Sequence, residues 1–98
     1  MTLPDASGQD RDVTPEELDA LIAGNVRAAR ARTRQRQEDL ADEMGWPRAT
    51  VTNLESGKRR ITLADAVALC AALKISLREL LQGAPDDVLQ ALRLTDSQ

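Results

Sequence analysis

The sequence predicts an all-α fold: a compact bundle of five short helices, with a helical extension before it and a short C-terminal helix after it. Apolar residues recur at three- and four-residue spacing through most of the 98 residues, and helix-start signals alternate with glycines that can end a helix. Aromatic content is 1%, so the core must be aliphatic and rich in alanine, which suits closely packed helices. A chain of this length holds one small domain.

The N-terminal part of the chain divides at Thr14. Residues 1–13 are polar and carry three Asp against one Arg, so we expect a disordered arm. Thr14, Pro15 and Glu17 then form a capping box with proline at the first helical position. The Gly24–Asn25 pair lies inside the apolar pattern that follows, and the helix either continues through this pair or breaks there.

Two helices joined by a tight turn are predicted next, over residues 37–56. The first, residues 37–44, has three inward-facing residues, Leu40, Ala41 and Met44. Gly45 can adopt the left-handed conformation that reverses the chain. Pro47 suits the start of a second helix, which ends at Gly57.

The second helix of this pair has an unusual outer face. Val51 and Leu54 point inward, and Thr50 and Glu55 lie at the borders. The outer residues are short, polar and nearly free of charge: Arg48, Ala49, Thr52, Asn53 and Ser56. Such a face can approach DNA base edges closely and hydrogen-bond to them. The alternative is that these are merely small surface residues.

The remaining helices are predicted from two further capping boxes. Thr62 with Asp65 starts a helix that ends at Leu73, and Ser76 with Glu79 starts a shorter one that Gly83 closes. We expect the inward face of the longer helix to be Leu63, Val67, Cys70 and Leu73. Ile75 and Leu80 are placed for a hydrophobic staple across the start of the shorter helix.

Residues 84–98 are predicted to form one more short helix with a tail. Its apolar stripe is Val88, Leu89, Leu92 and Leu94. The stripe either folds back on the core or is buried against a second subunit or another protein partner, and we expect a homodimer contact here.

Charge is distributed unevenly along the chain. The net charge is −3 and the pI about 4.9, which taken alone argues against a nucleic-acid partner. Residues 27–60, however, carry nine basic and five acidic residues. Local charge governs phosphate contact more than the total does, so this segment remains compatible with DNA.

Composition excludes several kinds of site. The chain has no His and one Cys, which excludes a zinc site, a disulfide framework and His-based catalysis. Cys70 is interpreted as a buried small hydrophobe. We expect no catalytic residue, metal or cofactor. The longest uncharged apolar run, residues 66–73, is too short to span a bilayer, and the acidic N-terminus lacks a signal-peptide layout, so a cytoplasmic protein is expected.

The spacing within residues 37–56 resembles the helix-turn-helix of the phage repressor and Cro-like family, also called the XRE family. Counted from Gln37, Ala is fifth, Gly ninth and a β-branched residue fifteenth. The resemblance extends over roughly residues 22–83, within a DNA-binding domain predicted at residues 14–83. The matching residues are Gln37, Glu38, Leu40, Ala41, Gly45, Thr50, Val51, Glu55, Gly57, Lys58 and Arg59.

The resemblance implies roles for particular residues. The second helix becomes the recognition helix, with base-reading positions at Arg48, Ala49 and Asn53 and with Thr50 and Thr52 beside them. Gln37 matches a glutamine that binds phosphate and braces the recognition helix, and Arg30 with Glu55 matches a partly buried structural pair. Further phosphate contacts are expected from Arg34, Arg36, Lys58, Arg59 and Arg60. For the arginines before Gln37, a solvated surface is the alternative.

The sequence departs from the family pattern in three places. Gly, an apolar residue and Ser or Thr often precede the glutamine, and this chain has Arg34, Gln35 and Arg36, so the first helix lacks its usual hydroxyl cap. Pro47 replaces a common Ser or Thr cap of the recognition helix. Trp46 replaces a smaller apolar residue and is interpreted as a lid on the turn rather than a phosphate contact.

These observations predict a DNA-binding transcriptional regulator. We expect a repressor that binds a pseudo-palindromic operator as a homodimer, with half-sites roughly 10 bp or a multiple of it apart. A controller of a restriction–modification operon is one form of this function. The alternative is an antitoxin-type interaction module that neutralises a toxin and regulates its own operon.

Overall fold

The computed structural model describes residues 13–93, and within that range the regular structure is entirely helical. The helices are α2 (Pro15–Arg32), α3 (Gln37–Met44), α4 (Arg48–Glu55), α5 (Leu63–Leu73), α6 (Leu77–Leu80) and α7 (Asp86–Ala91). Helices α2–α6 are the predicted five-helix bundle, and α7 is the predicted C-terminal helix. The predicted arm lies outside the described residues except for Val13, and so does Leu94.

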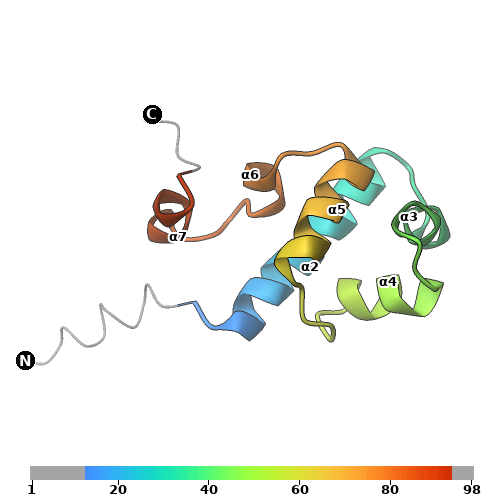
Figure 1. Ribbon diagram of the computed structural model, residues 1–98, viewed down its shortest axis with the longest axis horizontal. Helices are drawn as coiled ribbons and strands as arrows, with labels where there is room; N and C mark the ends of the chain where they lie inside the picture. Colours follow the sequence, from blue (N-terminus) through green and yellow to red (C-terminus); the bar gives the residue numbers. More distant parts are fainter. Residues whose placement is uncertain (1–12, 94–98) are drawn as a thin grey trace, which may run out of the picture.

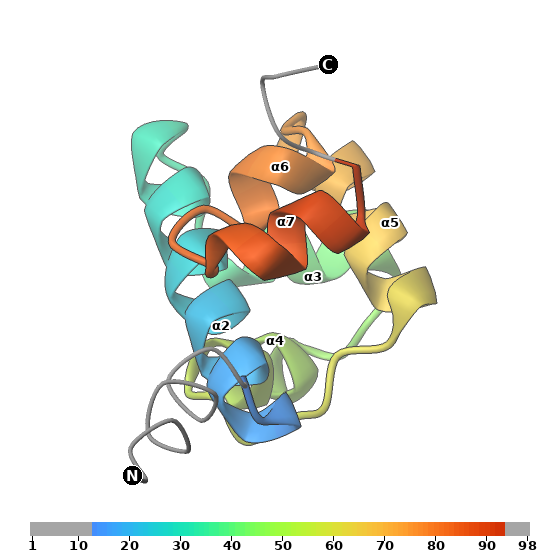
Figure 2. The same cartoon turned by 90° about the vertical axis from the view of Figure 1, so that its left-hand side faces the viewer.

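The long helix α2 contacts α4, α5 and α6, while α3 packs against α4 and α5. Helices α2 and α5 overlap in Figure 1, and Figure 2 shows them on the two sides of the view, with α6 and α7 drawn between them. One aliphatic core joins these five helices. Its fully buried side chains are Val26, Leu40, Val51, Leu54, Leu69 and Leu80. Helix α3 contributes Leu40 and α4 contributes Val51 and Leu54, so the core holds both helices of the pair in place.

Helix α2 is continuous through Gly24 and Asn25, which settles the alternative left open by the sequence. The predicted capping box at its start is present, with hydrogen bonds of 3.0 Å in both directions between Thr14 and Glu17. The helical extension that the sequence predicted before the bundle is therefore the N-terminal part of α2. Asn25 donates its side-chain amide to the carbonyls of Leu80 (2.7 Å) and Gln82 (2.9 Å), so it ties α2 to the end of α6.

The predicted inward face of α5 was wrong in part. Leu63 is 75% exposed and Val67 is 63% exposed, whereas Ala66, Leu69 and Leu73 are buried. The helix is apolar on nearly every side, so its sequence contains little contrast from which to identify the buried face. Helices α2, α3 and α6 pack against the face with Ala66, Leu69 and Leu73 and leave Leu63 and Val67 exposed.

The C-terminal stripe is divided between the core and the surface. Val88 and Leu89 are half-buried against the core cluster, and Leu92 is 49% exposed. The first part of the stripe therefore folds back on its own domain, which is the alternative that the sequence analysis did not prefer. Among residues 13–93, no helix is both long enough and apolar enough to cross a membrane.

Candidate nucleic-acid interface

Helix α3 begins at Gln37 and ends at Met44, as predicted. The missing hydroxyl cap is partly replaced by Asp39, whose carboxylate accepts a hydrogen bond of 2.8 Å from the backbone N–H of Arg36. This hydrogen bond is the main reason why the pKa of Asp39 lies below its ordinary value. Gly45 has a φ of +69°, and Trp46 N–H returns to the carbonyl of Ala41 at 2.9 Å, so the turn has the predicted form.

Helix α4 is the predicted recognition helix, and its burial pattern matches the two faces inferred from the sequence. Val51 and Leu54 are fully buried, and Glu55 is 3% exposed. Thr50 is half-buried, and the outward-facing residues are exposed: Arg48, Ala49, Thr52, Asn53 and Ser56. Pro47 is the N-cap, so α4 begins one residue later than predicted, and it has no side-chain cap.

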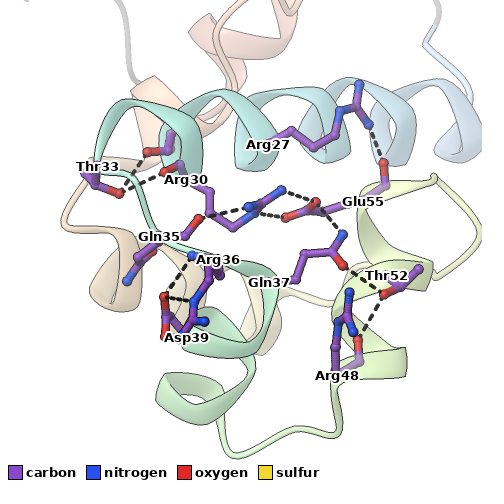
Figure 3. A network of polar contacts seen from close by, with 11 residues as sticks. Arg27, Arg30, Thr33, Gln35, Arg36, Gln37, Asp39, Arg48, Thr52 and Glu55 are labelled. Carbon is purple, nitrogen blue, oxygen red and sulfur yellow. Dashed lines mark hydrogen bonds and ion pairs between the residues drawn. The ribbon is translucent and has the colours of Figure 1, made fainter.

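A buried carboxylate connects α2 to α4. Glu55 accepts hydrogen bonds from Arg30 Nε at 2.7 Å and from Arg30 Nη2 at 2.9 Å, which makes the pair bidentate. The hydrogen bond to Glu55 is the main cause that raises the pKa of Arg30 above its ordinary value. Figure 3 shows Arg30 and Gln37 both directed at the Glu55 carboxylate. The structural pair expected from the resemblance is thus formed.

The network extends from Glu55 to the exposed face of α4 through Gln37. The Gln37 amide donates to Glu55 Oε1 at 3.1 Å, and its oxygen accepts from the Thr52 hydroxyl at 3.2 Å (Figure 3). Because a carboxylate only accepts hydrogen bonds, Glu55 fixes which way the amide points. The phosphate-binding role of Gln37 stays a prediction, and its bracing contacts with α4 are present.

Arg27 was missed by the sequence analysis as a part of this network. Its guanidinium donates to the backbone carbonyl of Glu55, the last residue of α4, and so satisfies a carbonyl that the helix leaves unpaired (Figure 3). Arg27 precedes Arg30 by three residues, which places both on one side of α2. That three-residue spacing is the signal from which the contact could have been predicted.

The predicted phosphate contacts before Gln37 lie on the surface. Arg34 is exposed and has a φ of +59°, at the position where the family often has glycine. Arg36 is exposed and makes two loose ion pairs of 3.5 Å, with Glu38 and Asp39. Such exposed pairs contribute little and can exchange for a phosphate.

The three basic residues after Gly57 differ in the ion pairs and ring contacts that they make within the domain. Lys58 is exposed and makes no ion pair within residues 13–93. Arg59 stacks over the Trp46 ring at 4.7 Å and reaches Asp65 at 3.4 Å. Arg60 pairs with Asp19 at 2.8 Å. The predicted phosphate roles therefore fit Lys58 best, since Arg59 and Arg60 are engaged within the domain.

Two residues that contact this loop from elsewhere in the fold, Asp19 and Trp46, have structural roles. Asp19, which the sequence analysis did not single out, is 6% exposed and accepts from the backbone N–H of Ile61 at 3.2 Å, so it fastens the α4–α5 loop to α2. Trp46 is half-buried against the core under Arg59, which agrees with its interpretation as a lid on the turn. Both residues hold elements that flank the exposed face of α4.

The exposed face of α4 is slightly hollowed. Arg48, Ala49, Thr52 and Asn53 line a shallow depression that is open to solvent. Ala49 is the smallest side chain of the four, with longer polar side chains beside it. Within residues 13–93 no cluster of His, Cys, Asp or Glu could hold a metal ion. The depression offers apolar contact and hydrogen-bonding groups side by side, as a major-groove surface requires.

The comparison with known families decides what this arrangement is. A profile described as Helix-turn-helix matches residues 26–80, which is more than half of the chain and includes α3 and α4. The chain belongs to the phage repressor and Cro-like helix-turn-helix family. It is accordingly a DNA-binding transcriptional regulator, of a class of proteins that are not enzymes.

This helix-turn-helix protein is similar to control proteins. Control protein C.SmaI of Serratia marcescens is 32% identical over 72 residues, which cover 74% of this chain and 86% of that protein. The solved structure of the restriction-modification controller protein C.AhdI from Aeromonas hydrophila is 32% identical and has a TM-score of 0.60, over 63% of this chain and 94% of that one. A hypothetical transcription factor from Neisseria, NHTF, is 30% identical with a TM-score of 0.64, over 82% and 92% of the two chains.

Proposed function

We propose that this helix-turn-helix protein is a sequence-specific repressor that acts as a homodimer in the cytoplasm, where its DNA lies. Each α4 would enter the major groove of one half-site of a pseudo-palindromic operator. The observation that carries the proposal is the exposed, almost uncharged face of α4, which Arg30, Glu55 and Gln37 brace from behind.

We further propose that Arg48 and Asn53 hydrogen-bond to bases. Arginine pairs bidentately with guanine and asparagine with adenine, and both side chains border the depression on α4. Phosphate contacts from Arg34, Arg36, Gln37 and Lys58 would set the register, and Arg59 and Arg60 would contribute only after leaving Asp65 and Asp19.

The names of the relatives support a narrower form of this function. Two of the similar proteins are named as control or controller proteins, and one of these is specified as a restriction-modification controller. We therefore propose that the operator lies beside genes for a restriction endonuclease and its methyltransferase. The antitoxin alternative depended on the C-terminal stripe, and Val88 and Leu89 of that stripe are used against the core, so we do not propose it.

The subunit contact is placed on α5 in this proposal. Leu63 and Val67 are one helical turn apart and largely exposed, and the exposed residues between and after them include Ala64, Ala68 and Ala71. A second copy that covers this uncharged face would remove two large apolar side chains from water, and the alanines would permit two helices to approach closely. Leu92 on α7 is a smaller exposed apolar surface.

The test is selection of bound duplexes from a random pool by the full chain. Two inverted half-sites spaced by roughly 10 bp or a multiple of it are expected. Recovery of sequences without any consensus would overturn the proposal of sequence-specific binding. A consensus with a single half-site would overturn the homodimer.

A further inference from the structure

The Thr52 side chain lies on the exposed face of α4, yet its hydroxyl hydrogen is already used. The hydroxyl oxygen is 3.2 Å from Gln37 Oε1 and 3.3 Å from the carbonyl oxygen of Arg48 (Figure 3). Both atoms are acceptors, and a hydroxyl has one hydrogen to donate. Thr52 therefore has no hydrogen left for a base, whichever of the two acceptors it serves.

The Gln37 amide cannot turn round to release that hydrogen. Its nitrogen donates to the Glu55 carboxylate, which in turn is held by two hydrogen bonds from Arg30. Reversing the amide would place its oxygen against a carboxylate that cannot donate. The buried Arg30–Glu55 pair thus keeps an acceptor facing Thr52.

Two kinds of base contact remain for Thr52. Its oxygen could accept a hydrogen bond, but only adenine and cytosine present donors in the major groove. Its methyl group could instead contact the C5-methyl group of thymine, which is the apolar group on a base edge in that groove. The surroundings of Thr52 distinguish these two contacts.

The methyl group of Ala49 lies three residues before Thr52, on the same side of α4, and both residues line the depression between Arg48 and Asn53. Because the Thr52 hydroxyl hydrogen is engaged by Gln37 or the Arg48 carbonyl, the methyl groups of Ala49 and Thr52 are the groups that this pair can offer to a base. We propose that Thr52, together with Ala49, is a specificity-determining residue that selects thymine through its C5-methyl group. This inference rests on the proposed function, because it requires α4 to face the major groove.

The experiment uses the duplex obtained from the selection described above, with thymines replaced by deoxyuridine one position at a time. Uracil differs from thymine only by the missing methyl group, so hydrogen bonding is unchanged. For the full chain, one position in each half-site is expected to lose affinity by about fourfold when the methyl group is removed, the value of one buried methyl-sized group. Fluorescence anisotropy of the labelled duplex measures the affinity.

Two substitutions at Thr52 separate the methyl from the hydroxyl. Thr52→Val keeps a methyl group and removes the hydroxyl, and it should retain the thymine-over-uracil preference. Thr52→Ser keeps the hydroxyl and removes the methyl group, and it should reduce that preference to below about twofold, since only Ala49 then contacts the thymine methyl group. Thermal unfolding of both variants checks that the domain is still folded.

The opposite pattern would overturn the inference. If Thr52→Val lost a base preference that Thr52→Ser kept, the hydroxyl would be the reading group. If no thymine position responded to uracil although the selection had returned a clear consensus, the thymine inference would fail while the proposed function stood. Failure of the selection itself would instead count against the proposed function.

Discussion

Arg34 adopts a strained backbone conformation at a position where we propose a phosphate contact. It follows the end of α2 with a φ of +59°, a conformation that glycine adopts without the steric cost that a Cβ brings. The backbone N–H groups of Arg34 and Gln35 return to the carbonyls of Ala31 and Arg30, so the turn needs this conformation. The exposed guanidinium is free to meet a phosphate.

Arg34→Gly should therefore separate stability from affinity. We expect the free energy of unfolding to rise by about 1 kcal/mol, because the backbone strain is relieved. Affinity for every DNA sequence should fall, and the slope of log K against log salt should decrease by about 1. Denaturant unfolding and DNA titrations at several salt concentrations measure the two effects.

Lys74→Gly is the matched control for Arg34→Gly. Lys74 caps α5 with a φ of +58° and is outside the predicted DNA contacts. It should show the gain in stability without the change in DNA affinity. Equal losses of affinity in both variants would remove Arg34 from the phosphate contacts.

Glu55 ties the C-terminal end of α4 to Arg30 of α2 and Gln37 of α3. It is 3% exposed and accepts from Arg30 and Gln37, so its removal would leave Arg30, itself 20% exposed, without its carboxylate. We expect Glu55→Ala to lower the free energy of unfolding by about 3 kcal/mol in denaturant titrations. Glu38→Ala is the control, since the exposed 3.5 Å pair of Glu38 with Arg36 should change stability by less than about 0.5 kcal/mol. Similar losses in the two variants would contradict the bracing role.

At the scale of the helices, the sequence predicted those elements whose ends carry a chemical signal. The capping boxes at Thr14, Thr62 and Ser76, and the positive φ of Gly45, follow from local hydrogen bonding and sterics, so a short stretch of sequence suffices. The two faces of α4 were also predicted, because Val51 and Leu54 contrast with polar neighbours.

The buried face of α5 and the contacts of Asp19 and Asn25 were not predicted correctly for one physical reason. Each depends on packing against a part of the chain that is distant in the sequence. Helix α5 is apolar on nearly every side, so only the positions of α2, α3 and α6 decide that Ala66 is buried and Val67 is not. The same holds for Asp19 and Asn25, whose partners are 42 and 55 residues away in the sequence. Such contacts are set by the tertiary fold and leave no local pattern.

The exposed part of α5 leads to a prediction about assembly. Leu63→Glu and Val67→Glu should convert the proposed dimer to a monomer, since each would bring a charge into an apolar contact. Sedimentation equilibrium measures the mass, and the affinity for a two-half-site duplex should fall with dimerisation. Leu92→Glu on α7 is the control and should leave the dimer intact. A dimer that survives the α5 changes and dissociates with Leu92→Glu would move the interface to α7.

For the whole molecule, charge distribution reconciles an acidic protein with a DNA partner. The net charge is −3, but the basic surplus is confined to residues 27–60, which contain the recognition helix and the loops on either side of it. Most of the acidic residues of the chain lie outside this segment. DNA approach is governed by the field near the binding face, which is where the arginines and Lys58 are concentrated.

The most direct test of the account is the binding of Arg48→Ala to the selected operator and to a panel with every single base-pair change, with Lys58→Ala measured beside it. If α4 reads bases, Arg48→Ala costs about 1–3 kcal/mol on the operator and removes discrimination at one base pair of each half-site. Lys58→Ala should weaken binding to all sequences alike and lower the salt slope. An equal loss on every sequence for Arg48→Ala would contradict the assignment of α4 as the reading helix.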